Sequence, residues 1–223
     1  MNTIQPKEMI HSLNAEQWNE MRRGGALERP DLSRCSLKGL DLSGFDLSQS
    51  DLTGTDLTGV RLCRANLEDA NLRQANLAQA DLTEAQLKGA MLMSANLSHA
   101  TLINASLRQV ELNSARLNNA DLTGADLSRA VLNGANFSQC SLKKADLRNA
   151  RLNATQLLGA DLSGAQLTQA DLSGAILEGT NLTGALLDKA GLKAAKLKGV
   201  ILRGHNLREV DLSGANLRGA DLR

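Results

Sequence analysis

The sequence predicts an all-β solenoid, and the spacing of its leucines is the main reason. Leucine occupies every fifth position from Leu32 to Leu222, 39 positions without an insertion, and only Phe137 departs from the pattern. A period of five matches neither the turn of an α-helix, about 3.6 residues, nor the alternating faces of a flat strand. The backbone therefore has to turn a corner every five residues if each leucine is to return to one interior.

Two further features identify the inside and the corner of each unit. The residue two places before the leucine is alanine in 25 of the 39 units. Residues two apart share one side of an extended segment, so a small and a large side chain pack inward together. The residue two places after the leucine is glycine in 16 units, as expected at the third position of a type II turn, where φ is positive. The predicted core is represented by Leu72, Leu122, Phe137 and Leu162.

The repeated motif A-[DN]-L-x-x, as in Ala65-Asn66-Leu67 and Ala125-Asp126-Leu127, resembles that of the pentapeptide-repeat family. The resemblance implies a right-handed quadrilateral β-helix with four five-residue sides per coil, with the leucine and the residue two before it inside. Four units per coil turn the 39 units into nearly ten coils. So uniform a pattern predicts a straight rod without bulges.

Residues 1–29 lack the repeat and are predicted to form a helical cap on a β-helix of residues 30–223. The segment contains apolar residues that suggest one or two short amphipathic helices: Met9, Ile10, Leu13, Trp18 and Met21. The first coil of a β-helix exposes unpaired backbone, which invites edge pairing with other chains. A helical cap would cover that edge.

Local signals place the ends of these helices. Pro6 suits a first helical turn. Asn14 followed by Gln17 resembles a capping box, in which each residue bonds the backbone N–H of the other. Gly24 and Gly25 indicate where the second helix stops.

Composition excludes several classes of protein. Aromatic residues make up 1 % of the chain, too few for an ordinary globular core. No apolar stretch approaches the ~20 residues of a membrane span, and the N-terminus lacks the apolar region of a signal peptide. We therefore expect a cytoplasmic protein that does not contact the membrane, with secretion by a route that needs no hydrophobic signal as the alternative. A bacterial source is a separate expectation.

The sequence contains no constellation typical of an enzyme. The histidines His11, His99 and His205 are not spaced as metal ligands. His205 takes an inward position near the C-terminal end, where a hydrated imidazole can be tolerated, and we expect no ligand role. Acidic residues lie on convex faces without the cleft that shifts carboxylate pKa values. We expect no enzymatic activity, no cofactor, no metal and no small-molecule substrate.

The charge is unevenly distributed although the net charge is only +1. Residues 31–126 carry 12 acidic and 8 basic side chains, whereas residues 127–223 carry 8 acidic and 13 basic ones. Residues twenty apart form columns on a rod of this kind, and several basic residues share columns. Such columns could dock an acidic partner. The candidate partner-binding residues are Lys143, Arg148, Lys193, Lys196, Lys198, Arg203, Arg208 and Arg218.

The last repeats have no predicted cover comparable to the cap. Unpaired strand edges associate readily, so we predict a homodimer through the C-terminal coil, with Leu217, Leu222 and Arg223 as the candidate dimer edge.

Three functions are compatible with such a rod. The first is a rigid interaction scaffold that presents charged columns to a protein partner. The alternative, implied by the family resemblance, is a DNA mimic that binds DNA gyrase and protects it from quinolones; this requires a strongly acidic rod, whereas this chain is nearly neutral. The third is ice binding, which needs an unbroken ladder of small hydroxyls; Ile103 and Lys143 interrupt the best column.

Overall fold

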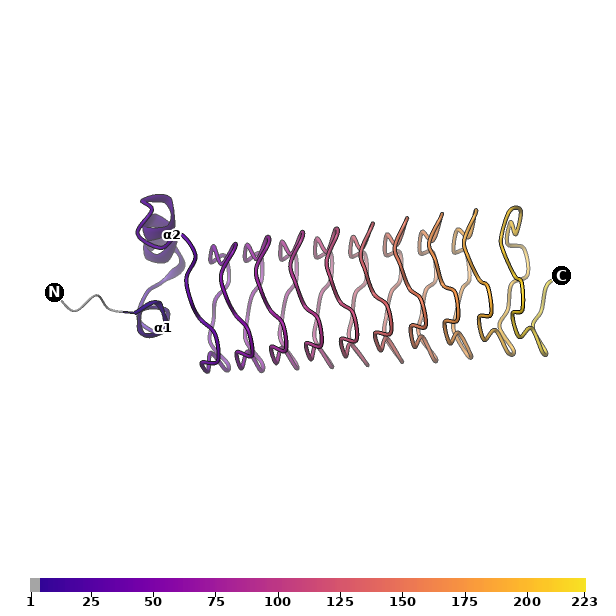
Figure 1. The fold of residues 1–223 in the computed structure, drawn as a ribbon, viewed down its shortest axis with the longest axis horizontal. Helices are drawn as coiled ribbons and strands as arrows, with labels where there is room; N and C mark the ends of the chain where they lie inside the picture. Colours follow the sequence, from indigo (N-terminus) through magenta and orange to yellow (C-terminus); the bar gives the residue numbers. More distant parts are fainter. Residues whose placement is uncertain (1–4) are drawn as a thin grey trace.

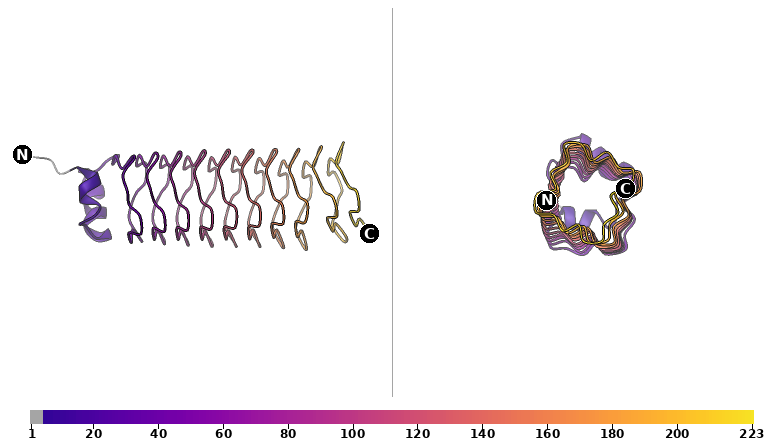
Figure 2. Two further views of the ribbon diagram at one scale, coloured as in Figure 1. Left: turned by 90° about the horizontal axis from the view of Figure 1, so that it is seen from below. Right: turned by 90° about the vertical axis from the view of Figure 1, so that its right-hand side faces the viewer.

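The computed structural model describes residues 5–223 as a straight stack of coils with two short helices at its N-terminal end (Figure 1). Residues 1–4 of the predicted cap lie outside the described residues. Viewed along the rod, successive coils superpose around a single interior (Figure 2). Residues twenty positions apart form parallel bridges, such as Asp41↔Arg61 and Asp121↔Ser141. Each bridge consists of a single residue pair, because a turn lies both before and after it in the chain. Parallel bridges stacked in this way along the rod form a β-helix.

A tight turn separates each five-residue side from the next. The Ala65 N–H donates to the Leu62 carbonyl over 3.0 Å, and the third residue of that turn, Arg64, has a φ of 57°. Positive φ recurs at this position in all 38 turns from Arg34 to Gly219, which comprise 16 glycines and 22 other residues. The predicted type II geometry is confirmed, and it holds whichever residue occupies the position.

The left-handed turn position gives a prediction that can be tested with two neighbouring residues. Gln169 has a φ of 59°, and a β-branched side chain is strained there. Gln169→Val should therefore lower the free energy of unfolding by about 1–2 kcal/mol. Thr168→Val, one residue earlier at an ordinary φ, should change it by less than about 0.5 kcal/mol. Denaturant unfolding of both variants checks this, and equal losses would contradict it.

The core is a continuous ladder of leucine and small residues. Leu72, Leu122, Phe137 and Leu162 are all 0 % exposed. The threonines at the small inward position, Thr55, Thr155 and Thr180, are accommodated by a recurring bond. The hydroxyl of Thr155, for example, donates to the carbonyl of Leu132, 23 residues earlier, over 3.2 Å. The interior therefore tolerates a small polar group when it reaches the leucine carbonyl of the preceding coil.

The helices begin and end where local signals predict. Helix α1 (Pro6–Met9) begins with Pro6, and helix α2 (Ala15–Arg23) is preceded by Asn14 and followed by Gly24. The capping box is confirmed: the Gln17 N–H donates to Asn14 Oδ1 over 3.0 Å, and the Asn14 N–H donates to Gln17 Oε1 over 3.1 Å. Within residues 5–223, neither helix has the length and apolar character needed to cross a lipid bilayer.

The stack is interrupted at one place near the C-terminal end, which we call the seam: residues 181–189 facing residues 201–209. The twenty-residue spacing would pair Asn181 with Ile201 and Leu186 with Asn206, but neither bridge forms within the described chain. The bridges on the other two sides of the coil are present, Gly191↔Asp211 and Ile176↔Lys196. The last coil accordingly has a different outline from the coils before it (Figure 1). The uniform sequence pattern did not predict this interruption.

His205 lies at the seam. Its Nε2 is 2.7 Å from the Leu182 carbonyl oxygen, whereas its Nδ1 is buried without a hydrogen-bond partner among the described residues. The ring is half-buried, with Nε2 beside a backbone carbonyl of the preceding coil.

Candidate interaction surface

The aspartates directly before the leucines are structural groups as well as surface charges. Asp41 Oδ1 accepts the Ser43 N–H over 3.1 Å, and Asp161 Oδ1 accepts the Ser163 N–H over 2.9 Å. The hydroxyl and the N–H of Ser43 beside the carboxylate lower the pKa of Asp41. For Asp161, burial raises the pKa, but the bonds from Ser163 and the charge of Lys143 more than offset it. These carboxylates stay ionised, with one oxygen turned to the backbone.

Many of the acidic side chains also have a basic neighbour. Arg64 Nε lies 2.7 Å from Glu84 Oε2, Arg61 Nη1 lies 3.2 Å from Asp41 Oδ2, and Arg108 Nε lies 3.8 Å from Asp126 Oδ2. Exposed pairs of this kind contribute little stability, but they neutralise charge locally. The N-terminal half of the rod therefore presents a weaker negative field than its count of carboxylates suggests.

Two of the eight candidate basic residues, Lys143 and Arg148, already form ion pairs with neighbouring carboxylates. Lys143 Nζ lies 3.5 Å from Asp161 Oδ2. Arg148 Nε donates to Asp146 Oδ1 over 2.9 Å, and this hydrogen bond and the charge of Asp146 raise the pKa of Arg148. Lys143 and Arg148 lie more than two coils before Lys193, the first of the remaining six residues.

The other six form a group that we call the basic collar. All six are exposed and form no ion pair with any residue in the described part of the chain: Lys193, Lys196, Lys198, Arg203, Arg208 and Arg218. They occupy the last coil and a half of the rod. This end therefore carries six exposed cations that form no ion pair in the described chain.

The collar surrounds the rod and does not form one patch. Each side of a coil is one five-residue unit, and two units lie on the same side of the rod when they are a multiple of twenty residues apart. Lys198 and Arg218 belong to two such units. The Gly199 N–H donates to the Arg218 carbonyl over 3.1 Å, so these two cations sit on successive strands about 4.8 Å apart. Lys196 lies on the same side, beside Asn216. Lys193, Arg203 and Arg208 lie one on each of the other sides.

The candidate dimer edge is only partly covered. Leu217 packs against the core while remaining half-buried, and Leu222 is 50 % exposed. Arg223 is exposed, and its Nε donates to Asp221 Oδ1 over 2.9 Å.

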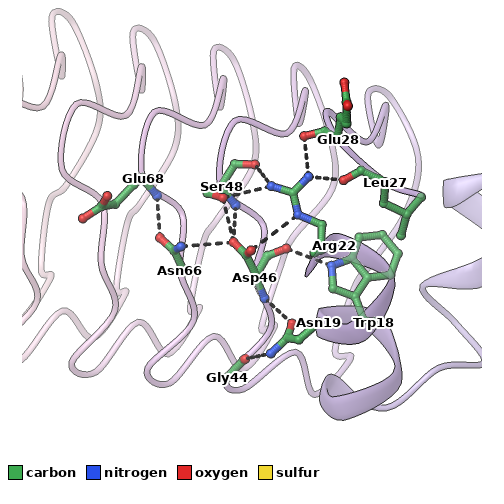
Figure 3. A network of polar contacts seen from close by, with 10 residues as sticks. All are labelled: Trp18, Asn19, Arg22, Leu27, Glu28, Gly44, Asp46, Ser48, Asn66 and Glu68. Carbon is green, nitrogen blue, oxygen red and sulfur yellow. Dashed lines mark hydrogen bonds and ion pairs between the residues drawn. The ribbon is translucent and has the colours of Figure 1, made fainter. Parts of the chain in front are cut away.

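The sequence analysis named Trp18 in the cap but did not single out Asn19 and Arg22, which meet the same edge at the N-terminal end of the rod. Helix α2 aims three side chains at the exposed edge of the first coil (Figure 3). Trp18 Nε1 donates to the Asp46 carbonyl over 2.8 Å, Asn19 Oδ1 accepts the Asp46 N–H over 2.7 Å, and Arg22 Nη2 donates to the Ser48 carbonyl over 2.6 Å.

These bonds replace a preceding coil. Elsewhere in the rod, a residue at the position of Asp46 donates to the coil before it, as Asp56 does to Cys35 over 2.9 Å. No coil precedes Asp46, so Asn19 accepts that N–H instead. The capping box and the apolar spacing reveal the helix in the sequence, but nothing in the sequence shows which polar side chains meet the edge.

The described residues contain no group of three or more His, Cys, Asp or Glu side chains placed to hold a metal ion. All three cysteines are free. Cys140 is buried, its Sγ donates to the Leu117 carbonyl over 2.7 Å, and burial raises its pKa to about 12. It therefore serves the core as a small residue.

Comparison with known proteins agrees with this architecture. A family model described as "Pentapeptide repeats" matches the chain in eight copies, over residues 31–69, 64–98, 90–129, 130–169, 165–204 and 190–223. No match is found among curated protein sequences.

Solved structures include a similar protein that spans nearly the whole chain. It is HetL, a pentapeptide repeat protein involved in heterocyst differentiation regulation from the cyanobacterium Nostoc sp. strain PCC 7120. The two chains are 34 % identical over 92 % of this chain and 94 % of HetL, with a TM-score of 0.57. Another is alr5209 from Nostoc PCC 7120, 33 % identical over 45 % of this chain and 83 % of its own, with a TM-score of 0.30. Full-length QnrB1, a plasmid-mediated fluoroquinolone resistance protein, is 17 % identical over 84 % of this chain and 92 % of its own, with a TM-score of 0.36.

Proposed function

Because this chain belongs to the pentapeptide-repeat family, whose members are generally structural or interaction scaffolds, we propose that it is a non-enzymatic scaffold that binds a protein partner. Residues 30–223 form nearly ten coils of a right-handed β-helix in this proposal, and residues 1–29 form its cap. The rod is the rigid support, and the basic collar is the docking surface for an acidic protein surface.

The basic collar is the observation that carries the proposal. Arg64 and Lys143 each form an ion pair with a carboxylate, whereas none of the six collar residues, which are gathered in the last coil and a half, forms an ion pair in the described chain. An unpaired exposed cation keeps its field available to an incoming partner and speeds association with acidic surfaces. HetL is involved in regulation, and we infer the same broad class of role for this chain.

The gyrase-binding alternative fits the surface less well. A DNA mimic needs a dense, outward negative field, but the net charge is +1 and the aspartate columns turn one oxygen to the backbone. Several aspartates are also paired with arginine. A cationic collar would repel a surface that binds DNA.

Charge reversal at the collar tests the proposal. The triple variant Lys198→Glu, Arg203→Glu and Arg208→Glu should reduce capture of the partner in a crosslinking pull-down from bacterial lysate by about tenfold or more, because like charges at the interface oppose binding. The matched control reverses three cations of the N-terminal half that also have no ion pair in the described chain: Arg34, Arg73 and Lys88. This control should capture the partner as well as the unaltered protein does.

Two results would overturn the scaffold proposal. One is equal loss of the partner in both charge-reversed proteins. The other is capture of gyrase that survives collar reversal but is lost, together with an effect on supercoiling, when the acidic column is reversed at Asp41, Asp81, Asp121 and Asp161.

We also propose that the protein is cytoplasmic and forms a homodimer through its last coil, at Leu217, Leu222 and Arg223. The exposed half of Leu222 supports this, since burial against a second copy would remove apolar surface from water. Light scattering after size exclusion gives the mass directly, and a monomer at tens of micromolar would refute the dimer.

A further inference from the structure

Four cations of the basic collar form an ordered series. Lys193, Lys198, Arg203 and Arg208 are spaced five residues apart, and each directly follows a leucine of the repeat. Four consecutive units complete one turn of the coil, so these residues occupy its four sides in succession. All four are exposed, and none forms an ion pair within residues 5–223. We call this series the cationic spiral.

The position directly after the leucine is rarely basic elsewhere in the rod. In the last seven units it carries six basic residues, with Ser213 as the exception. In the 32 units before them it also carries only six, and most of the others are serine, threonine or asparagine. The fold therefore does not require a cation at this position, and the concentration at one end is a property of the surface.

The carboxylates beside the spiral are engaged by other groups. Glu209 pairs with Lys189 at 3.4 Å, and Asp188 Oδ1 accepts a bond from Asn206 over 2.7 Å. Asp211 Oδ1 accepts a backbone N–H over 2.9 Å. The spiral cations therefore keep their charge available for a partner.

A flat or stiff partner cannot contact the whole spiral. Lys198 and Arg208 lie on opposite sides of the rod, as do Lys193 and Arg203, because the members of each pair are two units apart. Facing sheets are separated by about 10 Å at the backbone, and the exposed cations extend beyond them. A rigid acidic surface therefore meets one side or two adjacent sides. Duplex DNA, with a persistence length on the order of 50 nm, cannot follow the turn.

A flexible chain can follow the spiral. Lys193 and Arg208 are separated by fifteen residues of coil, a path of at most about 50 Å. An extended peptide of about 20 residues reaches about 66–72 Å, enough for the wider ring of the side chains. Disordered segments wrap large surfaces in this way. A single-stranded nucleic acid is also flexible, but residues 190–223 contain no Phe, Tyr or Trp on which bases could stack.

We propose that the partner presents a disordered segment of about 20 residues, rich in Asp and Glu, that wraps the last coil along the cationic spiral. This inference rests on the proposed function and specifies the form of acidic surface that the collar binds. One bound segment contacts all four sides, so cations on opposite sides contribute to the same binding event.

Fluorescence anisotropy with a labelled peptide of ten Glu-Gly repeats tests the spiral on the full chain. At about 150 mM salt, charges are screened beyond about 8 Å, so a substitution acts on the side that carries it. Lys198→Glu, Arg203→Glu and Arg208→Glu should each weaken binding by about three- to tenfold, because each removes one contact of the same chain.

Two variants and a shorter peptide serve as controls. Arg203→Lys keeps the charge and should bind within about twofold of the unaltered protein. Lys88→Glu changes an exposed cation at the same repeat position, five coils before the spiral and without an ion pair in the described chain; it should also stay within about twofold. A peptide of three Glu-Gly repeats, at most about 20 Å long, cannot reach opposite sides and should bind at least about tenfold more weakly.

Losses confined to one side or to two adjacent sides would overturn the wrapped segment and indicate a folded acidic surface. Tighter binding of a single-stranded DNA with the same number of charges would overturn the assignment to a peptide. Absence of peptide binding, together with collar-dependent capture of a partner from lysate, would overturn this proposal and leave the proposed scaffold function intact.

Discussion

Leu122→Ala is expected to lower the free energy of unfolding by about 2–5 kcal/mol. Leu122 is 0 % exposed and lies in the middle of the rod, with a coil on either side. Its N–H donates to the Ser141 carbonyl over 2.7 Å, so the backbone is held in place and cannot collapse into the space that the leucine leaves. The loss therefore combines transfer of the side chain to water with a cavity in the ladder.

Denaturant unfolding followed by circular dichroism measures this loss, and the chain supplies its own control. Leu158 is 46 % exposed, so Leu158→Ala removes the same atoms and should cost less than about 0.5 kcal/mol. Phe137→Leu should lower the free energy of unfolding by less than about 1.5 kcal/mol, because leucine occupies this position in all the remaining units of the ladder. If Leu122→Ala and Leu158→Ala had the same free energy of unfolding, the leucine ladder would not be the core.

Trp18→Ala is expected to destabilise the N-terminal end of the rod by about 3–5 kcal/mol. The indole is 0 % exposed, its ring centroid lies 5.9 Å from that of Phe45, and Nε1 donates to the Asp46 carbonyl over 2.8 Å. The substitution removes apolar packing and one of the bonds that take the place of a preceding coil. The uncovered edge should then favour association between chains.

Thermal unfolding and sizing together check this prediction. Trp18→Phe keeps the ring beside Phe45 but lacks the N–H, so it should lose about 1–2 kcal/mol. Glu20→Ala, on the exposed side of the same helix, should stay within about 0.5 kcal/mol of the unaltered protein. If Trp18→Ala were as stable and as monodisperse as Glu20→Ala, helix α2 would not be the cover of the first coil.

The repeat determined most of the fold through interactions that span only a few residues. The turn at Arg64 closes with a bond from Ala65 to Leu62, and that bond lies within a single unit and its first neighbour. The aspartate bonds, such as Ser43 to Asp41, are equally local. Because every unit repeats these choices, the sequence alone predicts the corner, the inward leucine and the type II turn. The limits of helix α2 were predictable for the same reason, from Asn14 and Gln17.

Tertiary structure decided which polar side chains meet the edge of the first coil and which of the candidate cations form ion pairs. Asn19 and Arg22 meet the edge of the first coil across 26 or more residues of sequence, and no repeat relates those segments. The six collar residues are defined by the absence of an ion pair in the described chain, which depends on side-chain positions across coils. The missing bridges of the seam likewise have no signal in the sequence, because the repeat continues through residues 181–209 without interruption. The sequence by itself determined the periodic interior, because its interactions are local, whereas the distinctive sites arise where that periodicity ends.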